Sequence, residues 1–354
     1  MPACLRKIFL AAAVAVAVSG AEPLAGEVVD LEFSRPAAGS DEGRTLSSVV
    51  AVRGVNVRYS TGGVYLLTHY GDRSGLFEEE NRTLLEEPWI GQPWRFCSVF
   101  SSSAGDSVII GRNWDNQNVG SIIVSFYHPA GGYASVSFCR AIDLGFGENL
   151  ALDEIAQSPF GKRLLLAPFY SMDGINERGL VVALAGLRQT VVRSPGRTKP
   201  LMFISYLIRT ILDRAGSVDE AVRLAGENIP FDLEEGVLNG HLFIGDDAGR
   251  SVILEYGDDG WRATPGTGAW QVMTTKPVSD VPEADLRASC WRYRTISEAL
   301  ERGGGTAGWR TGMEILQSVQ QNGTTWSAVY SPGSGELRFC VYQEWDTVYR
   351  VKAF

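Results

Sequence analysis

Strand-forming residues and turn residues alternate along much of the chain. The pattern predicts extended segments near 49–57, 64–70, 98–100, 108–110, 121–127, 133–138 and 180–187. Two further hairpins are predicted, one over 241–256 and one over 324–343, each around a cluster of Asp, Gly, Pro or Ser residues. The segment 180–187 is apolar and rich in Val and Ala, which is typical of a buried strand.

Helical periodicity appears in two separate parts of the chain. After Pro200, residues 201–214 carry a broad apolar face, and Gly216 can end this helix. Ser217 and Glu220 then have capping-box spacing, which predicts the start of a second helix. A second pair is predicted at about 285–301 and 309–320, separated by three consecutive glycines, and shorter helices are predicted at 78–85 and 150–157.

The predicted elements follow the order strands, helical pair, strands, helical pair, strands. This order suits an α+β fold in which two antiparallel sheets lie between layers of helices. A length of 354 residues allows one large domain or two small ones.

The first 21 residues are expected to be a signal peptide. Arg6 and Lys7 precede the apolar run 8–18, and small residues follow it. The run is too short to span a membrane, so we expect a secreted or periplasmic protein with no membrane insertion after signal removal. Its removal changes the formal net charge from −9 to −11, because it holds two basic residues and no acidic one. An acidic protein without a basic stripe is a poor partner for nucleic acid.

Residues 97–115, CSVFSSSAGDSVIIGRNWD, predict a hairpin that carries three reactive side chains. If a two-residue turn closes it at the midpoint, Arg112 lies opposite Cys97, with Cβ atoms about 5 Å apart. Asp115 then lies just beyond this pair. The hairpin therefore brings a thiol, a guanidinium and a carboxylate to one end, although a buried cysteine beside a solvated ion pair fits the same pattern.

Other catalytic patterns do not occur in the sequence. It contains no Gly-x-Ser-x-Gly elbow, no His-Glu-x-x-His and no phosphate-binding loop. The histidines are His69, His128 and His241, so a Cys97–His241 dyad is an alternative that no motif supports. With Cys97 kept as a thiol in an oxidising compartment, the remaining cysteines after the signal peptide allow at most one disulfide: Cys139, Cys290 and Cys340.

The hairpin, with Cys97 first and GRNWD last, resembles the opening of the linear amide C–N hydrolases. This branch of the N-terminal-nucleophile hydrolases includes penicillin V acylases, choloylglycine hydrolases and isopenicillin N acyltransferases. The stretch DGINERGL at 173–180 is similar to the family's Asp-x-x-Asn-Glu-x-Gly-Leu. HLFIGD, SVILE and TTWSAVY, which begin at 241, 251 and 324, continue the likeness in family order. The resemblance covers about residues 97–345 and implies a four-layer αββα sandwich.

The resemblance implies a mechanism that needs no histidine. A cut before Cys97 would free an α-amine with a reference pKa of about 7.7–8.0, which suits a general base for the thiol. Arg112 would favour the thiolate, and Asp115 would hold the amine. The enzyme would cleave a linear amide of a small N-acyl compound through a thioester, with no metal and no organic cofactor.

The chain departs from the family pattern at the oxyanion site. Choloylglycine hydrolases have an asparagine in Thr-Asn-x-Pro, and the corresponding stretch here is Thr-Thr-Lys-Pro, so Thr275 replaces it. Asn239 and backbone N–H groups are the other candidate donors. Arg292 resembles a late arginine that some members keep near the nucleophile, and Arg294 is its competitor. Trp114 either lines an acyl pocket or packs inside the sandwich.

Residues 22–96 are expected to be a leader or pro-segment that becomes a separate small subunit, as in the family's penicillin acyltransferases. The alternative is a permanently attached β-rich subdomain. Residues 97–354 then form the hydrolase domain.

Two alternative functions are an acyltransferase that passes the thioester to an amine and a non-catalytic binding protein with the same fold. The sequence leaves the acyl group, the leaving amine and a homo-oligomeric state open.

Overall fold

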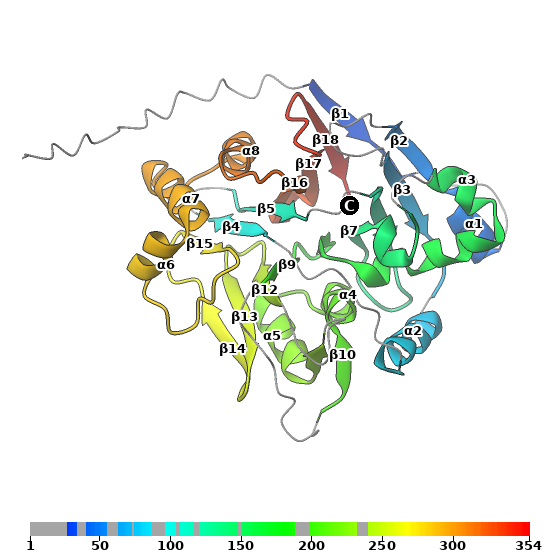
Figure 1. The fold of residues 1–354 in the computed structure, drawn as a ribbon, viewed down its shortest axis with the longest axis horizontal. Coiled ribbons are helices and arrows are strands. Elements are labelled where there is room, and N and C mark those ends of the chain that lie inside the picture. The colour runs from blue at the N-terminus through cyan, green and yellow to red at the C-terminus, as the bar shows by residue number, and fades with distance from the viewer. Residues whose placement is uncertain are drawn as a thin grey trace, which may run out of the picture.

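Two β-sheets lie against each other in the protein, with helices outside them (Figure 1). The computed structural model describes residues 27–33, 40–54, 63–72, 74–86, 96–103, 107–116, 120–147, 151–187, 199–231 and 240–354. The predicted signal peptide and Asn239 lie outside these ranges.

The first sheet, sheet A, has seven strands and contains the candidate hairpin. Its order is β1–β18–β17–β16–β5–β4–β15. The bounds of its strands are β1 Glu27–Leu31, β4 Ser98–Ser102, β5 Ile109–Asp115, β15 Trp270–Met273, β16 Thr324–Ser331, β17 Glu336–Val341 and β18 Thr347–Lys352.

The second sheet, sheet B, has nine strands in the order β14–β13–β12–β9–β8–β7–β6–β3–β2. The bounds of its strands are β2 Val50–Gly54, β3 Gly63–His69, β6 Ile122–Tyr127, β7 Ser135–Arg140, β8 Asp173–Asn176, β9 Val181–Gly186, β12 Gly240–Gly245, β13 Ser251–Gly257 and β14 Gly260–Pro265. The short strands β10 Leu201–Phe203 and β11 Ile229–Phe231 form a separate parallel pair.

Helices cover the outer faces of both sheets. Helices α7 and α8 contact sheet A, α6 contacts α7, and α4 and α5 contact sheet B (Figure 1). The bounds of the helices are α1 Asp41–Ser47, α2 Ser74–Glu86, α3 Leu152–Ala156, α4 Ile204–Arg214, α5 Val218–Gly226, α6 Glu283–Ser289, α7 Trp291–Arg302 and α8 Trp309–Ser318, with 3₁₀ helices at Ala141–Leu144, Pro159–Tyr170 and Pro332–Ser334. The predicted αββα sandwich is confirmed.

Strand alternation gives sheet A two buried faces. Cys97 and Trp114 belong to the core between the sheets, whereas Phe100 and Ile109 belong to the core under α6, α7 and α8. Because successive side chains of a strand point to opposite faces, the sequence places the thiol inside the sandwich. Both faces of β4 and β5 are buried, and these strands carry polar as well as apolar side chains.

The segment before Cys97 supplies edge strands to both sheets. β1 pairs in parallel with β18 at one edge of sheet A. β3 pairs in parallel with β6 of sheet B, and β2 extends that edge. Every residue of β3 is buried. The three described strands of 22–96 are therefore built into the two sheets.

A few elements differ from the predictions. Residues 201–203 form β10 rather than the first turn of α4, because they pair with β11, which follows α5. Ser217 caps α5 as predicted, accepting from Glu220 N at 3.4 Å, and the Glu220 carboxylate accepts from Gly216 N at 2.6 Å. β1, β14, β15 and β18 are among the strands that were not predicted. No helix in the described part of the chain combines the length and the hydropathy needed to cross a membrane.

Candidate active site

Cys97 immediately precedes the hairpin of β4 and β5. Val99 pairs with Arg112, and Phe96 N donates to Asp115 O at 3.0 Å. The predicted register, with Arg112 opposite Cys97, is therefore wrong by two residues. It centred the hairpin between Ala104 and Gly105, whereas the observed pairing is centred one residue further along the chain. A shift of two residues keeps each side chain on its predicted face, so Cys97 and Arg112 still share the face between the sheets.

Arg112 is fully buried, and most of its partners lie on sheet B. Nε lies 3.1 Å from Asp173 Oδ2, Nη2 donates to Leu184 O at 3.1 Å, and Nη1 donates to Asn113 O at 3.2 Å. Burial alone would lower the pKa of the guanidinium, but the negative charges of Asp173 and Cys97 raise it. Arg112 therefore remains a cation. It lies on the same face of sheet A as the thiol, but opposite Val99 rather than Cys97.

Asp173 is a site residue to which sequence reasoning gave no role. Its carboxylate accepts from Trp326 Nε1 at 3.2 Å and from Tyr330 OH at 2.6 Å, in addition to the contact with Arg112. Trp114 is fully buried and stacks on Trp326 with ring centroids 5.1 Å apart. Of the two uses considered for Trp114, packing inside the sandwich is therefore the one observed. The only sequence signal for Asp173 was its position at the start of DGINERGL.

Asp115 points to the opposite face from Arg112, because the two residues are three positions apart on one strand. Oδ1 accepts from Thr324 Oγ1 at 2.5 Å, and Oδ2 lies 3.6 Å from Arg292 Nη1. Oδ2 receives no hydrogen bond from any described residue. Burial raises the pKa of Asp115 to about 7, although Thr324 and both arginines act to lower it. This carboxyl can accept one further donor.

Arg292, in the first turn of α7, connects these groups. Nη1 donates to Phe96 O at 2.8 Å, to Cys97 O at 2.6 Å and to Ser98 Oγ at 2.9 Å. Only 5% of Arg292 is exposed, whereas Arg294 lies on the exposed side of the helix. Between the two arginines that the sequence left open, Arg292 is the one that reaches Cys97. Its guanidinium donates a hydrogen bond to the carbonyl oxygen of the Phe96–Cys97 peptide bond.

Thr275 lies beside Arg292, and its Oγ1 accepts from Arg292 Nη2 at 3.0 Å. It follows β15, the strand that pairs with β4, so the sheet brings it to the start of the candidate hairpin. Through Arg292 the structure connects Cys97, Asp115 and Thr275. Arg112, the fifth predicted residue, lies on the same face of sheet A as Cys97 but opposite Val99. Asn239, the sixth, lies outside the described residues.

The histidines are placed differently from a Cys–His dyad. His241 Nδ1 lies 3.1 Å from Glu255 Oε1, and Nε2 lies 2.6 Å from Thr274 O. Both ring nitrogens are therefore engaged by other acceptors. His128 is exposed, and His69 is buried edge-on to Tyr127, with ring centroids 6.1 Å apart.

No disulfide joins the described cysteines, and all four are buried: Cys97, Cys139, Cys290 and Cys340. The disulfide that the sequence allowed is not formed among them. Within the described ranges, no three His, Cys, Asp or Glu side chains form a group that could hold a metal ion.

Comparison with known proteins finds similarity in structure but not in sequence. No protein-family model matches the chain, and no curated protein matches it. Among solved structures, penicillin V acylase from Agrobacterium tumefaciens is 16% identical, with a TM-score of 0.53 over 72% of this chain and 86% of that chain. A cysteine-to-alanine mutant of conjugated bile acid hydrolase from Clostridium perfringens is 11% identical, with a TM-score of 0.54 over 73% of this chain and 92% of that one. An arginine-to-leucine variant of the same hydrolase is 12% identical, with a TM-score of 0.53 over 72% of this chain and 92% of that one. The chain therefore has the fold that penicillin V acylase and conjugated bile acid hydrolase share.

Proposed function

We propose that this protein is a secreted N-terminal-cysteine amidohydrolase that matures by cleaving its own chain before Cys97. The mature enzyme hydrolyses a linear amide of a small N-acyl compound through a thioester on Cys97. The solved structures with this fold are named as a penicillin V acylase and a conjugated bile acid hydrolase, both enzymes of small molecules. These names support a small-molecule substrate and leave its identity open.

One observation carries this proposal. Arg292 Nη1 lies 2.8 Å from the carbonyl oxygen of Phe96, the acyl group of the peptide bond that Cys97 would cleave. An uncleaved structural protein has no need of a buried cation on this carbonyl, because a β-ladder would satisfy the oxygen at less desolvation cost. A cation at this place stabilises the negative charge that develops when a thiolate attacks the carbonyl carbon.

Self-cleavage then follows from known thiol chemistry. The Cys97 sulfur forms a bond to the Phe96 carbonyl carbon while the oxygen takes up charge beside Arg292. The carbon–nitrogen bond breaks, and the Cys97 nitrogen leaves as an amine after taking a proton. Water hydrolyses the resulting thioester, which gives a carboxylate on Phe96 and restores the thiol.

Turnover repeats these steps on an external amide. The new α-amine takes the thiol proton, the sulfur attacks the acyl carbon, and the leaving amine takes the proton away. Asp115 Oδ2, which no described hydrogen bond fills, is the acceptor that suits the α-ammonium. Water then releases the acyl group as a carboxylic acid.

N-terminal sequencing of every chain in the purified protein tests the proposal. We expect one chain that begins at Cys97 and one that begins after the signal peptide. We also expect hydroxylamine, added during turnover, to trap the acyl group as a hydroxamate at the expense of the acid. A single fully active chain that retains Phe96 next to Cys97 would contradict self-cleavage.

The Cys97→Ala variant supplies the matched control. It should stay uncleaved and release no amine from any N-acyl substrate. Amine release by this variant at the wild-type rate would show that the nucleophile lies elsewhere.

A further inference from the structure

His241 is a fully buried histidine whose ring nitrogens both face acceptors. Nε2 lies 2.6 Å from the carbonyl oxygen of Thr274, and Nδ1 lies 3.1 Å from Glu255 Oε1. A carbonyl oxygen can only accept, so Nε2 must carry a hydrogen. The ring is thus a fixed donor from β12 to the backbone at Thr274.

Glu255, on the neighbouring strand β13, holds the same segment further along. Oε1 accepts from Val278 N at 2.8 Å, and Oε2 accepts from Ser279 N at 2.7 Å. Burial would raise the pKa of Glu255, but the His241 ring and the Ser279 N–H lower it to about 2. Glu255 is therefore a carboxylate whose two oxygens are both hydrogen-bonded.

These contacts cross from one sheet to the other. His241 and Glu255 belong to sheet B, whereas the segment 274–279 leaves β15 at the edge of sheet A. His241 bonds the first residue of this segment, and Glu255 bonds the last two. Thr275 lies between these attachments, and Pro277, in the same stretch, has no N–H to donate.

Thr275 is in turn the partner of Arg292 Nη2 at 3.0 Å, and Arg292 Nη1 contacts the carbonyls of Phe96 and Cys97. His241 and Glu255 are therefore connected to the Phe96–Cys97 bond through the backbone of segment 274–279 and the hydrogen bonds of Thr275 and Arg292. We propose that His241 and Glu255 are positioning residues that fix Thr275 against Arg292 and so hold the oxyanion-stabilising groups at Cys97. This inference rests on the proposed function, because the groups it positions are those of that reaction.

The first test compares substitutions at His241. His241→Leu removes the donor to Thr274 O, whereas the amide of His241→Gln can still donate to it. We expect His241→Leu to lower kcat about 10- to 100-fold with a smaller change in KM, since small displacements of positioning groups have effects of this size. His241→Gln should recover most of that loss. Amine release from acetyl to decanoyl p-nitroanilides gives both constants.

The second test asks whether the effect passes through Thr275. Glu255→Gln leaves one N–H of the segment without an acceptor, and Thr275→Val removes the hydroxyl without changing the volume. If Glu255 acts by placing Thr275, the double variant should lose no more than about threefold in kcat beyond the worse single variant. A purely structural role for Glu255 would instead make the two losses multiply.

A matched control lies on the same hairpin. Asp246 is buried at the turn between β12 and β13, where it accepts from Arg250 N at 3.1 Å and Val218 N at 3.2 Å. Asp246→Asn makes the same chemical change as Glu255→Gln, so it should lower the melting temperature and leave kcat unchanged. The inference would be overturned if Glu255→Gln and Asp246→Asn lowered kcat equally, or if the kcat losses of Glu255→Gln and Thr275→Val multiplied in the double variant. In either case, amine release by the wild-type protein would still support the proposed function. Absence of amine release by wild-type protein, with Cys97 still joined to Phe96, would instead overturn the proposed function and this inference with it.

Discussion

Arg292 combines charge and geometry that lysine does not provide. Its two terminal nitrogens reach different partners: Nη1 reaches the Phe96 and Cys97 carbonyls, and Nη2 reaches Thr275. A planar guanidinium can make these contacts at once, whereas an ammonium group on a flexible stem acts as a point charge. The residue is therefore suited to hold an oxyanion in a fixed place.

Arg292→Ala should slow self-cleavage and turnover by about 10²-fold or more, because a positioned donor to the oxyanion is lost. Arg292→Lys should recover only part of this loss. Intact mass against time measures cleavage directly, and Arg294→Ala, two residues along the same helix, is the matched control that should cleave normally. Normal cleavage by Arg292→Ala would refute its role in the reaction.

Asp115 makes the free energy of unfolding of the uncleaved chain depend on pH. Its carboxyl is buried beside Thr324 and has an oxygen that no described residue hydrogen-bonds, and burial raises its pKa to about 7. In the unfolded chain the same group has a pKa near 3.8. Between these values the folded state binds more protons than the unfolded state, so the free energy of unfolding decreases as pH rises.

In the Cys97→Ala chain, which cannot cleave, this contribution predicts that the free energy of unfolding falls by about 3 kcal/mol between pH 4 and pH 7. Adding Asp115→Asn should remove that part of the pH dependence, since an amide does not titrate. Urea unfolding of both variants across this range measures the difference. Parallel pH profiles for the two variants would mean that Asp115 has an ordinary pKa when folded.

At the scale of elements, the β4–β5 hairpin depends on close packing as well as on pairing. A Cβ added at Gly111 would overlap the ring of Phe100, its cross-strand partner. Phe100 belongs to the core under α6, α7 and α8, so its ring cannot move outward without disturbing that layer. The glycine therefore allows an aromatic ring to lie flat over the strand that carries Arg112 and Asp115.

Gly111→Ala should lower the stability of the protein by about 1–3 kcal/mol, as overpacked cores usually do. It should also slow cleavage, because the hairpin places the reacting groups. Gly257→Ala, at the end of β13 with no heavy atom within 4 Å of the added Cβ, is the matched control. Thermal unfolding compares the two, and equal melting temperatures would show that Phe100 repacks without cost.

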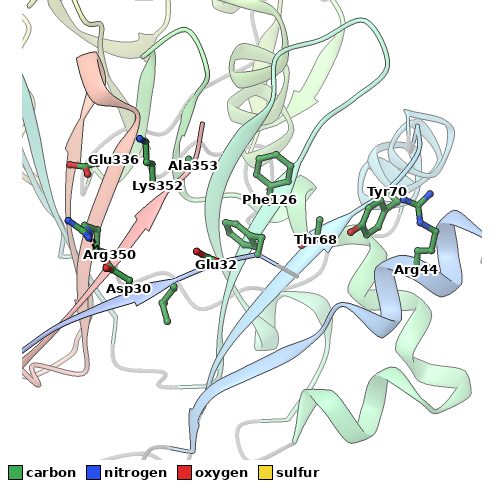
Figure 2. A pocket seen from close by; sticks show the side chains of 12 residues that line it. Asp30, Glu32, Arg44, Thr68, Tyr70, Phe126, Glu336, Arg350, Lys352 and Ala353 are labelled. Carbon is green, nitrogen blue, oxygen red and sulfur yellow. Dashed lines mark hydrogen bonds and ion pairs between the residues drawn. The ribbon is translucent and has the colours of Figure 1, made fainter. Parts of the chain in front are cut away.

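At the scale of the whole molecule, the segment before Cys97 completes both sheets. β1 lies against β18, and the fully buried β3 lies between β2 and β6. Each fully buried large apolar side chain contributes about 1.5–3 kcal/mol, and β3 supplies several. β1 also borders an open cavity of about 1250 Å³ between the sheet edges, lined by charged residues of β18 and by Phe126 and Tyr70 (Figure 2).

We therefore expect the leader to remain bound after cleavage, as a small subunit that does not exchange. Size-exclusion chromatography of cleaved protein should show both chains in one peak under native conditions and two peaks in denaturant. A chain expressed from Cys97 onward, without β1, β2 and β3, should be insoluble or unfolded. Release of the leader under native conditions, with activity retained, would contradict this prediction.

Short stretches of the sequence were enough to predict the layers of the fold and to select a candidate site. Local hydrophobic periodicity predicted the strand and helix pairs, because burial on one or both faces leaves a pattern in neighbouring residues. The resemblance around Cys97, Arg112 and Asp115 selected the hairpin of β4 and β5, and its catalytic role stays a prediction. These features are encoded within short stretches, so no tertiary contact was needed to find them.

The register of the β4–β5 hairpin, the partners of Arg112 and the choice between Arg292 and Arg294 depend on contacts between distant parts of the chain. The β4–β5 pairing is centred one residue later than the turn residues predicted, so Arg112 lies opposite Val99 rather than Cys97. Asp173 and Arg112 come from different sheets, so their contact has no local signal. Arg292 was distinguished from Arg294 only by the face of α7 that packs on the hairpin, because a helix buries one side and exposes the other.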